Sequence, residues 1–104
     1  MNRNERMLLI AMAQPELFVA QITYLDARGT VTDRVVSPVL YLTEDVLRAY
    51  CLGREAVRSF RSKRILRVRL KLSADCLCPE ALATLVSHTN KLRPDKSTET
   101  IAER

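Results

Sequence analysis

Between Ile65 and Leu72, apolar and cationic side chains alternate strictly along the sequence. A repeat of two residues is the repeat of a β-strand, in which successive side chains point to opposite faces. The pattern predicts a strand with one buried face and one solvated face. We expect the apolar residues to be buried and the cationic ones to be exposed, which assigns Leu66, Val68, Leu70 and Leu72 to the core and Arg67, Arg69 and Lys71 to solvent.

Upstream of this segment, the sequence breaks into further short stretches of strand character with turn residues between them. Asp26 to Gly29 supplies turn chemistry, with a glycine that can adopt positive φ, and Gly53 to Glu55 supplies a second tight turn. Pro38 should end one strand, because proline cannot donate to a hydrogen-bonded ladder. The expected strands upstream are Leu17–Asp26, Thr30–Ser37, Val46–Leu52 and Ala56–Arg61, with a short apolar stretch at Val39–Leu42.

Helical patterns frame the strands on both sides. Asn4–Ala13 carries apolar residues at helical spacing and is stopped by Pro15, and a second pattern starts at Pro79 and runs to Leu92. Five short antiparallel strands close most economically into a barrel, which removes exposed edges. We therefore expect a mainly β, α+β fold: a small antiparallel β-barrel of about five strands with an N-terminal and a C-terminal helix.

The length of 104 residues and the apolar content of 47% suit one domain with one core. We expect this domain to span residues 1–92 and residues 93–104 to form a disordered polar tail. The longest apolar run, Met7 to Ala13, is shorter than the ~20 residues of a membrane span, and it lacks the features of a secretion signal. The sequence therefore predicts a cytoplasmic protein with no membrane partner.

Metal and catalytic chemistry find little support in the sequence. The three cysteines are an odd number, which indicates reduced thiols rather than a disulfide framework. Cys76 and Cys78 lie closer together than the usual zinc spacing, and no fourth ligand accompanies them and His88. No glycine-rich phosphate loop, serine elbow or suitably spaced carboxylate pair occurs. We expect no metal, no cofactor and no catalytic residue, so the protein should not be an enzyme.

The net charge of +5 is unevenly distributed. The segment from Val46 to Leu72 contains nine basic residues and one acid, Glu55, so it carries +8 and the rest of the sequence sums to −3. Charge gathered in this way raises the local potential over one part of the surface. An anionic partner, such as nucleic acid or a nucleotide, is the interpretation that this asymmetry favours.

The stretch from Ile22 to Val68 resembles the WYL domain family in several separate places and in the same order. The stretches that carry the resemblance are Ile22–Tyr24, Gly29, Arg34–Pro38, Leu47–Cys51 and Arg58–Ile65. The tripeptide that names the family is replaced here by Asp45-Val46-Leu47, and the sequence contains no tryptophan. The family's usual DNA-binding winged helix is also missing, so we expect a free-standing or fragment form.

The resemblance implies an SH3/Sm-like barrel that serves transcription regulation or phage defence. It further implies a basic pocket for an anionic ligand, often a nucleotide or single-stranded nucleic acid. Matched by motif, that ligand-binding pocket would contain Tyr24, Arg58, Arg61 and Arg64. Arginine suits this role because its planar guanidinium can bind phosphate through two parallel hydrogen bonds.

Less specific interpretations of these residues stay open at this point. Arg58, Arg61 and Arg64 could be solvated strand residues with one or two structural ion pairs, and Phe60 is more typical of a core than of a base-stacking surface. The leading hypothesis is a regulatory or accessory module that binds a nucleic acid or nucleotide-like anion. The alternative is a protein-interaction or dimerisation module without a small ligand. The expected partners also include a larger regulatory or defence protein and a second copy of the same protein as a homodimer.

Overall fold

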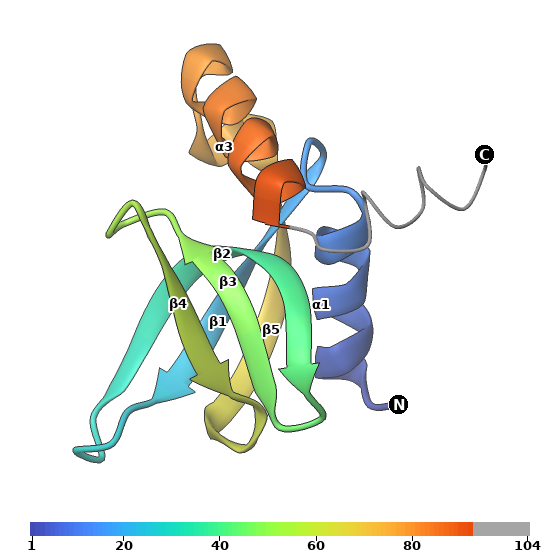
Figure 1. The fold of residues 1–104 in the computed structure, drawn as a ribbon. Helices are drawn as coiled ribbons and strands as arrows, with labels where there is room; N and C mark the ends of the chain where they lie inside the picture. Colours follow the sequence, from blue (N-terminus) through green and yellow to red (C-terminus); the bar gives the residue numbers. More distant parts are fainter. Residues whose placement is uncertain (93–104) are drawn as a thin grey trace, which may run out of the picture.

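The computed structural model describes the backbone of residues 1–92 and the side-chain environment of residues 1–87. The predicted tail at 93–104 and the side chain of His88 lie outside these ranges. Figure 1 shows strands with helices at both ends. In sequence order the elements are α1 (Arg3–Ala13), β1 (Phe18–Leu25), β2 (Val31–Thr43), β3 (Val46–Cys51), β4 (Ala56–Arg61), the 3-10 helix η1 (Ser62–Arg64), β5 (Ile65–Leu72), α2 (Ser73–Cys76) and α3 (Pro79–Leu92).

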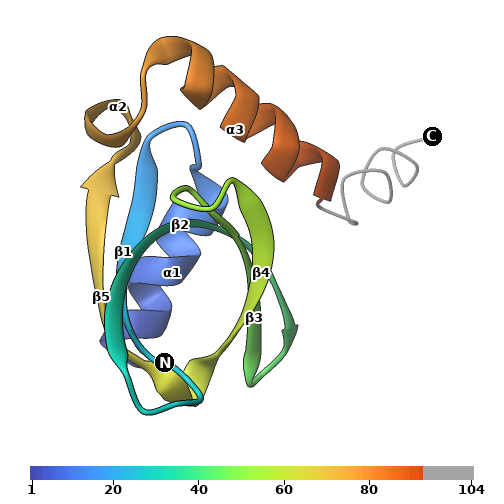
Figure 2. The ribbon, with the colours of Figure 1, turned by 90° about the vertical axis from the view of Figure 1, so that its left-hand side faces the viewer.

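The five strands form one antiparallel sheet in the order β4-β3-β2-β1-β5. The sheet is strongly curled, as the view along its axis in Figure 2 shows. A mainly β, antiparallel, five-stranded fold with a helix at each end of the described residues is therefore confirmed. Closure into a barrel is not: β4 and β5 are the two edges of the sheet, and no strand ladder joins them within residues 1–92.

The β1–β2 hairpin is shaped by the turn residues that the sequence indicated. The Oδ1 atom of Asp26 accepts hydrogen bonds from the backbone N–H groups of Arg28 and Thr30, both at 2.9 Å. Gly29 adopts φ +85°, a region that glycine enters without a steric penalty. Asp26 therefore places Arg28 at the tip of a well-defined turn.

Strand β2 does not end at Pro38, contrary to our expectation. It continues to Thr43, so Thr30–Ser37 and Val39–Leu42 are parts of one strand. Pro38 pairs with Ala49 while Leu40 pairs with Arg48, so the register shifts at this point. Proline is tolerated at such a bulge because the ladder is already interrupted there and no donor is required.

The burial expected for β5 is correct in part. Ile65 pairs with Tyr24 and Arg67 with Thr23, which leaves Leu66 unmatched in a bulge. The bulge turns Ile65 inward and leaves Leu66 at 50% exposure, while Val68 is buried at 4%. Leu70 is half-buried, and Leu72, at the end of the strand, is 52% exposed. The three cationic side chains of this strand are exposed as predicted.

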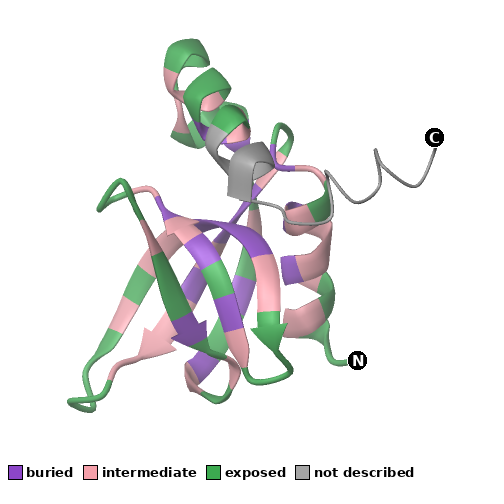
Figure 3. Cartoon of the chain, viewed as in Figure 1, coloured by how far each residue is buried: buried purple, intermediate pink, exposed green. Residues whose placement is uncertain are grey.

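Helix α1 covers one side of the curled sheet and contributes to its core. Leu8 and Ala11 are buried with sheet residues that include Ile22, Leu47 and Phe60. Figure 3 shows buried segments, in purple, on both α1 and the strands. A capping box starts the helix: the Glu5 backbone N–H donates to Asn2 Oδ1 at 2.8 Å, and the Asn2 backbone N–H donates to Glu5 Oε1 at 3.1 Å. The core thus lies between α1 and the concave face of the sheet.

After β5, the sequence predicted helix α3 but not the short helix α2. Ser73 opens the short helix α2 and is fully buried; its Oγ donates to the Pro15 carbonyl at 2.9 Å, and its N–H donates to the Leu17 carbonyl at 2.9 Å. These bonds tie the end of β5 to the start of β1. Helix α3 then crosses above the sheet (Figure 1), and Leu85 is its one buried side chain among those described. None of the helices within residues 1–92 is long and apolar enough to span a membrane.

Candidate anion-binding groove

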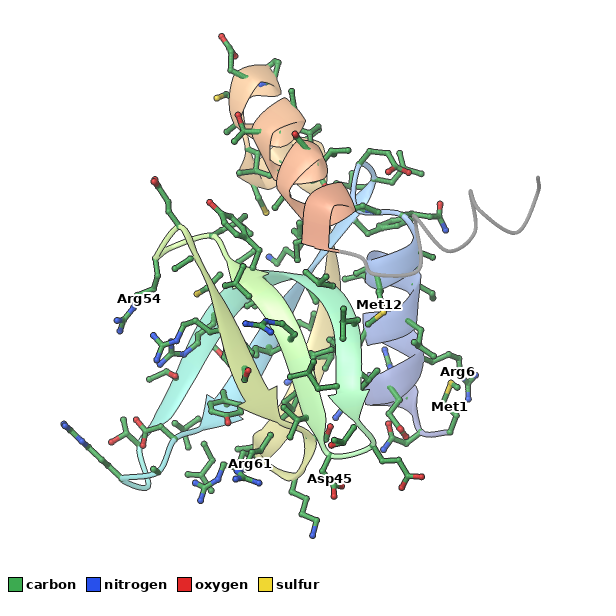
Figure 4. All side chains as sticks on the ribbon, in the orientation of Figure 1. Met1, Arg6, Met12, Asp45, Arg54 and Arg61 are labelled. Carbon is green, nitrogen blue, oxygen red and sulfur yellow. The ribbon has the colours of Figure 1, made fainter. Side chains whose placement is uncertain are left out.

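Two adjoining depressions of about 500 Å³ and about 270 Å³ meet at Tyr24. Together we call them the basic groove. It runs between the tip of the β1–β2 hairpin and strand β4, and Figure 4 shows Arg54 and Arg61 on the side of the sheet away from α1. The groove is lined by Tyr24, Asp26, Ala27, Arg28, Arg34, Val46, Arg54, Arg58, Ser59, Phe60, Arg61 and Arg64.

An aromatic pair forms the floor of the groove. Tyr24 and Phe60 pack edge to face, with ring centroids 5.1 Å apart and an interplanar angle of 84°. Phe60 is 2% exposed and belongs to the core, whereas Tyr24 is half-buried and lines both depressions. The Tyr24 hydroxyl accepts a hydrogen bond from the backbone N–H of Arg61 at 3.0 Å. Tyr24 therefore joins β1 to β4 and is held in place from two sides.

The larger depression gathers four arginines, Arg28, Arg34, Arg54 and Arg58, around one acid. That acid, Asp26, already accepts the two backbone hydrogen bonds of the hairpin turn. Within the described residues none of these guanidinium groups forms an ion pair with a carboxylate. Arg34 donates from Nε to Thr32 Oγ1 at 3.3 Å, and the other three are exposed. The larger depression therefore holds more positive charge than its one acid can balance.

Arg64 has a structural role in the smaller depression. Its Nη1 donates to the backbone carbonyl of Asp26 at 2.9 Å and, at 3.5 Å, to that of Leu25. These bonds fasten the hairpin tip to the start of β5, so Arg64 shapes the groove as well as lining it. Arg61, next to it on β4, is exposed and lines the same depression.

The four residues selected from the sequence are thus brought together. Tyr24 lines both depressions, Arg58 lines the larger one, and Arg61 and Arg64 line the smaller one. Their part in binding stays a prediction. Sequence reasoning missed Arg28, Arg34 and Arg54, because two of them lie in turns and the third pairs across the hairpin with Ile22. The sequence did offer one signal: Arg28 and Arg54 both lie in predicted turns. The turns of two hairpins that pack side by side lie at the same end of a sheet, so the two arginines could have been expected near one another.

A larger cavity of about 800 Å³ lies beside α1, and its charges are of mixed sign. Its lining includes the acids Glu5, Glu44 and Asp45 together with Lys63, and it contains no arginine. Burial raises the pKa of the Tyr41 phenol above its ordinary value, and the nearby Glu5 carboxylate raises this pKa further. Despite its size, this cavity lacks the excess of positive charge found in the basic groove, so we place the candidate anion site in the groove.

No cluster of three or more potential metal ligands occurs among the described residues.

A curled antiparallel sheet with a helix on one side and a cation-rich groove on the other defines a small, mainly β domain with an open basic site. A family model described as WYL domain matches residues 8–70, which is more than half of the sequence. This protein therefore belongs to the WYL domain family.

The protein is also similar to a solved structure, proteasome accessory factor B/C (PafBC) of Arthrobacter aurescens. The TM-score is 0.50 and the sequence identity is 25%. The match covers 80% of the present sequence but only 14% of PafBC, so it corresponds to a small part of that protein. No curated protein matches the sequence.

Proposed function

We propose that this protein is a regulatory or accessory module that binds single-stranded nucleic acid or a nucleotide-like anion in the basic groove. The observation that carries this proposal is the convergence of four arginines without carboxylate partners, Arg28, Arg34, Arg54 and Arg58, beside the half-buried ring of Tyr24. Cations that track a phosphate backbone and an aromatic surface for a base are the two features that single-strand binding sites combine. The strong curl of the sheet supports an SH3/Sm-like scaffold for this site.

Membership of the WYL family and the likeness to a protein named as a proteasome accessory factor support a regulatory or accessory role. Because the match covers 14% of PafBC, we propose that this module works with a larger regulatory or defence protein in the cytoplasm. The groove has neither paired carboxylates nor a histidine among its lining residues. We accordingly propose binding rather than catalysis as its function.

The test is a binding titration with a fluorescently labelled single-stranded oligonucleotide at increasing salt concentration, followed by anisotropy. If about three phosphates are neutralised, log K should fall against log salt with a slope of roughly −2, at about −0.7 per phosphate on a single strand. A nucleoside triphosphate should compete with the oligonucleotide for the groove. Absence of binding to the oligonucleotide and to the nucleotide at low salt would contradict the proposal and favour a protein-interaction module.

A further inference from the structure

Strand β4 is an edge strand, and its open edge borders the basic groove. Next to its end, the Ser62 N–H points toward β3 and donates to the Asp45 carbonyl at 2.8 Å. The Arg61 N–H instead points away from β3 and donates to the Tyr24 hydroxyl at 3.0 Å. Hydrogen-bonded and non-hydrogen-bonded residue pairs alternate along an antiparallel ladder. These two bonds therefore fix which residues of β4 direct their backbone N–H and C=O toward its open edge.

Following this alternation backward from Arg61, the backbone N–H and C=O of Ser59 and of Val57 face the open edge, and those of Phe60 and Arg58 face β3. Ser59 lines both depressions of the groove, whereas Val57 lines neither. Ser59 therefore presents a backbone N–H and a backbone carbonyl at the groove, and no other strand occupies these groups within residues 1–92.

A donor and an acceptor side by side select the chemistry of their partner. A phosphate group offers acceptors only, so it would satisfy the N–H but would meet the carbonyl dipole unfavourably. The edge of a nucleobase offers donors and acceptors together, and it can pair with both groups. The ring of Tyr24 lies across the same two depressions and gives the face of a base a surface on which to stack.

We propose that the backbone of Ser59 binds the edge of a nucleobase, while the arginines of the groove hold the phosphates. This inference rests on the proposed function and names the part of the ligand that each wall of the groove contacts. Beside stacking on Tyr24, it assigns a share of the base-dependent affinity to the backbone N–H and C=O of Ser59, which no side-chain motif records. Because a peptide group can pair with several bases, the contact favours bases over bare phosphate and sugar without selecting one sequence.

The experiment compares two labelled single strands of equal length, one of mixed sequence and one with abasic residues throughout. Ser59→Pro removes the N–H, and proline is tolerated on an edge strand where the N–H faces away from the ladder. Val57→Pro is the matched control, because it removes the same kind of N–H from the same edge outside the groove. We expect S59P to bind the mixed-sequence strand about five-fold more weakly than V57P does, the loss of one neutral hydrogen bond, with binding of the abasic strand unchanged.

A measurement on the parent protein addresses the case in which S59P fails to fold, as thermal melting would reveal. In an ¹⁵N-resolved NMR titration, the Ser59 amide resonance should shift with the mixed-sequence strand and stay in place with the abasic strand. Equal losses for both strands in S59P, or equal affinity of the parent protein for both strands, would overturn this inference but leave the proposed function standing. Failure of the parent protein to bind either strand would overturn the proposed function itself.

Discussion

The side-chain amide of Asn4 lies on the outer edge of β5 beside Val68. Its Oδ1 accepts a hydrogen bond from the Val68 N–H at 3.2 Å, and its Nδ2 is 3.5 Å from the Leu66 carbonyl oxygen that it faces. The amide thus takes the place that a peptide group of a sixth strand would occupy. Edge strands with unpaired backbone groups are prone to pair with other proteins. Helix α1 therefore protects one of the two edges of the sheet through a single residue.

Replacing Asn4 by Ala should lower the free energy of unfolding by about 1–2 kcal/mol, because the Val68 N–H loses its acceptor next to a buried side chain. Urea denaturation measures this loss. Arg6→Ala on the same helix is the control, since Arg6 is exposed and should change stability by no more than about 0.5 kcal/mol. Equal effects of the two substitutions would contradict the role given to Asn4.

The alternation of the sequence placed Leu66 and Val68 together in the core, but the bulge in β5 leaves Val68 buried and Leu66 exposed. Val68→Asp should cost about 3 kcal/mol or more, because a buried carboxylate would have no partner. Leu66→Asp should cost less than about 1 kcal/mol, since Leu66 is already half exposed to solvent. The two midpoints of urea denaturation give the comparison. Similar destabilisation by both variants would mean that Leu66 lies in the core and that the bulge is absent.

Removing an arginine from the basic groove should flatten the salt dependence of oligonucleotide binding. We expect Arg58→Ala and Arg54→Ala each to reduce the slope of log K against log salt by up to about 0.7, the share of one phosphate contact. Arg69→Ala is the matched control, because Arg69 is exposed on β5 and does not line the groove. Equal reductions in all three variants would indicate a diffuse electrostatic surface in place of a groove.

The Tyr41 hydroxyl is buried and has no hydrogen-bond partner among the described residues. Tyr41→Phe should therefore leave stability near neutral pH unchanged or slightly increased, because an unsatisfied polar atom is removed. Since the pKa of Tyr41 is raised in the folded protein, the folded state holds the phenolic proton more tightly than the unfolded state does. Stability should accordingly fall as pH rises above the unfolded value of about 10.

In the Tyr41→Phe variant, the loss of stability at alkaline pH should be smaller than in the parent protein. Urea denaturation of both proteins at neutral and alkaline pH tests the difference. An equal alkaline loss in the Tyr41→Phe and parent proteins would show that Tyr41 is not the group responsible.

The strands, turns and terminal helices could be predicted because each depends on local chemistry. The Asp26–Gly29 turn, for instance, requires one acceptor side chain and one residue at positive φ, and both are visible in the sequence. The bulges at Pro38 and at Leu66 could not be predicted, because a bulge depends on the partner strand as much as on its own residues. A strand that continues through Pro38 and an alternation that breaks at Leu66 become visible only when the registers of β3 and β1 are known.

The candidate site, like the fold, could be predicted only in part. Tyr24, Arg58, Arg61 and Arg64 followed from the family resemblance, and the groove does contain them. Arg28 and Arg54 belong to the turns of different hairpins, and the folded sheet brings both to the larger depression of the groove. The outward backbone N–H and C=O of Ser59 have no signature in the sequence, since their direction depends on the register of β4 against β3, which the bonds of Arg61 and Ser62 reveal.

The link from the Tyr24 hydroxyl to the backbone of Arg61 has a consequence for how the groove opens. A closed barrel would join β4 to β5 by a ladder of several hydrogen bonds, whereas here the end of β4 is held against β1 by this hydrogen bond and by the packing of Tyr24 on Phe60. The two walls can separate by breaking this hydrogen bond and the aromatic contact while the β3–β4 ladder stays intact. Amide hydrogens report such local opening. The Arg61 amide should exchange with solvent deuterium faster than the Phe60 amide beside it, and a ligand that bridges the walls should slow that exchange.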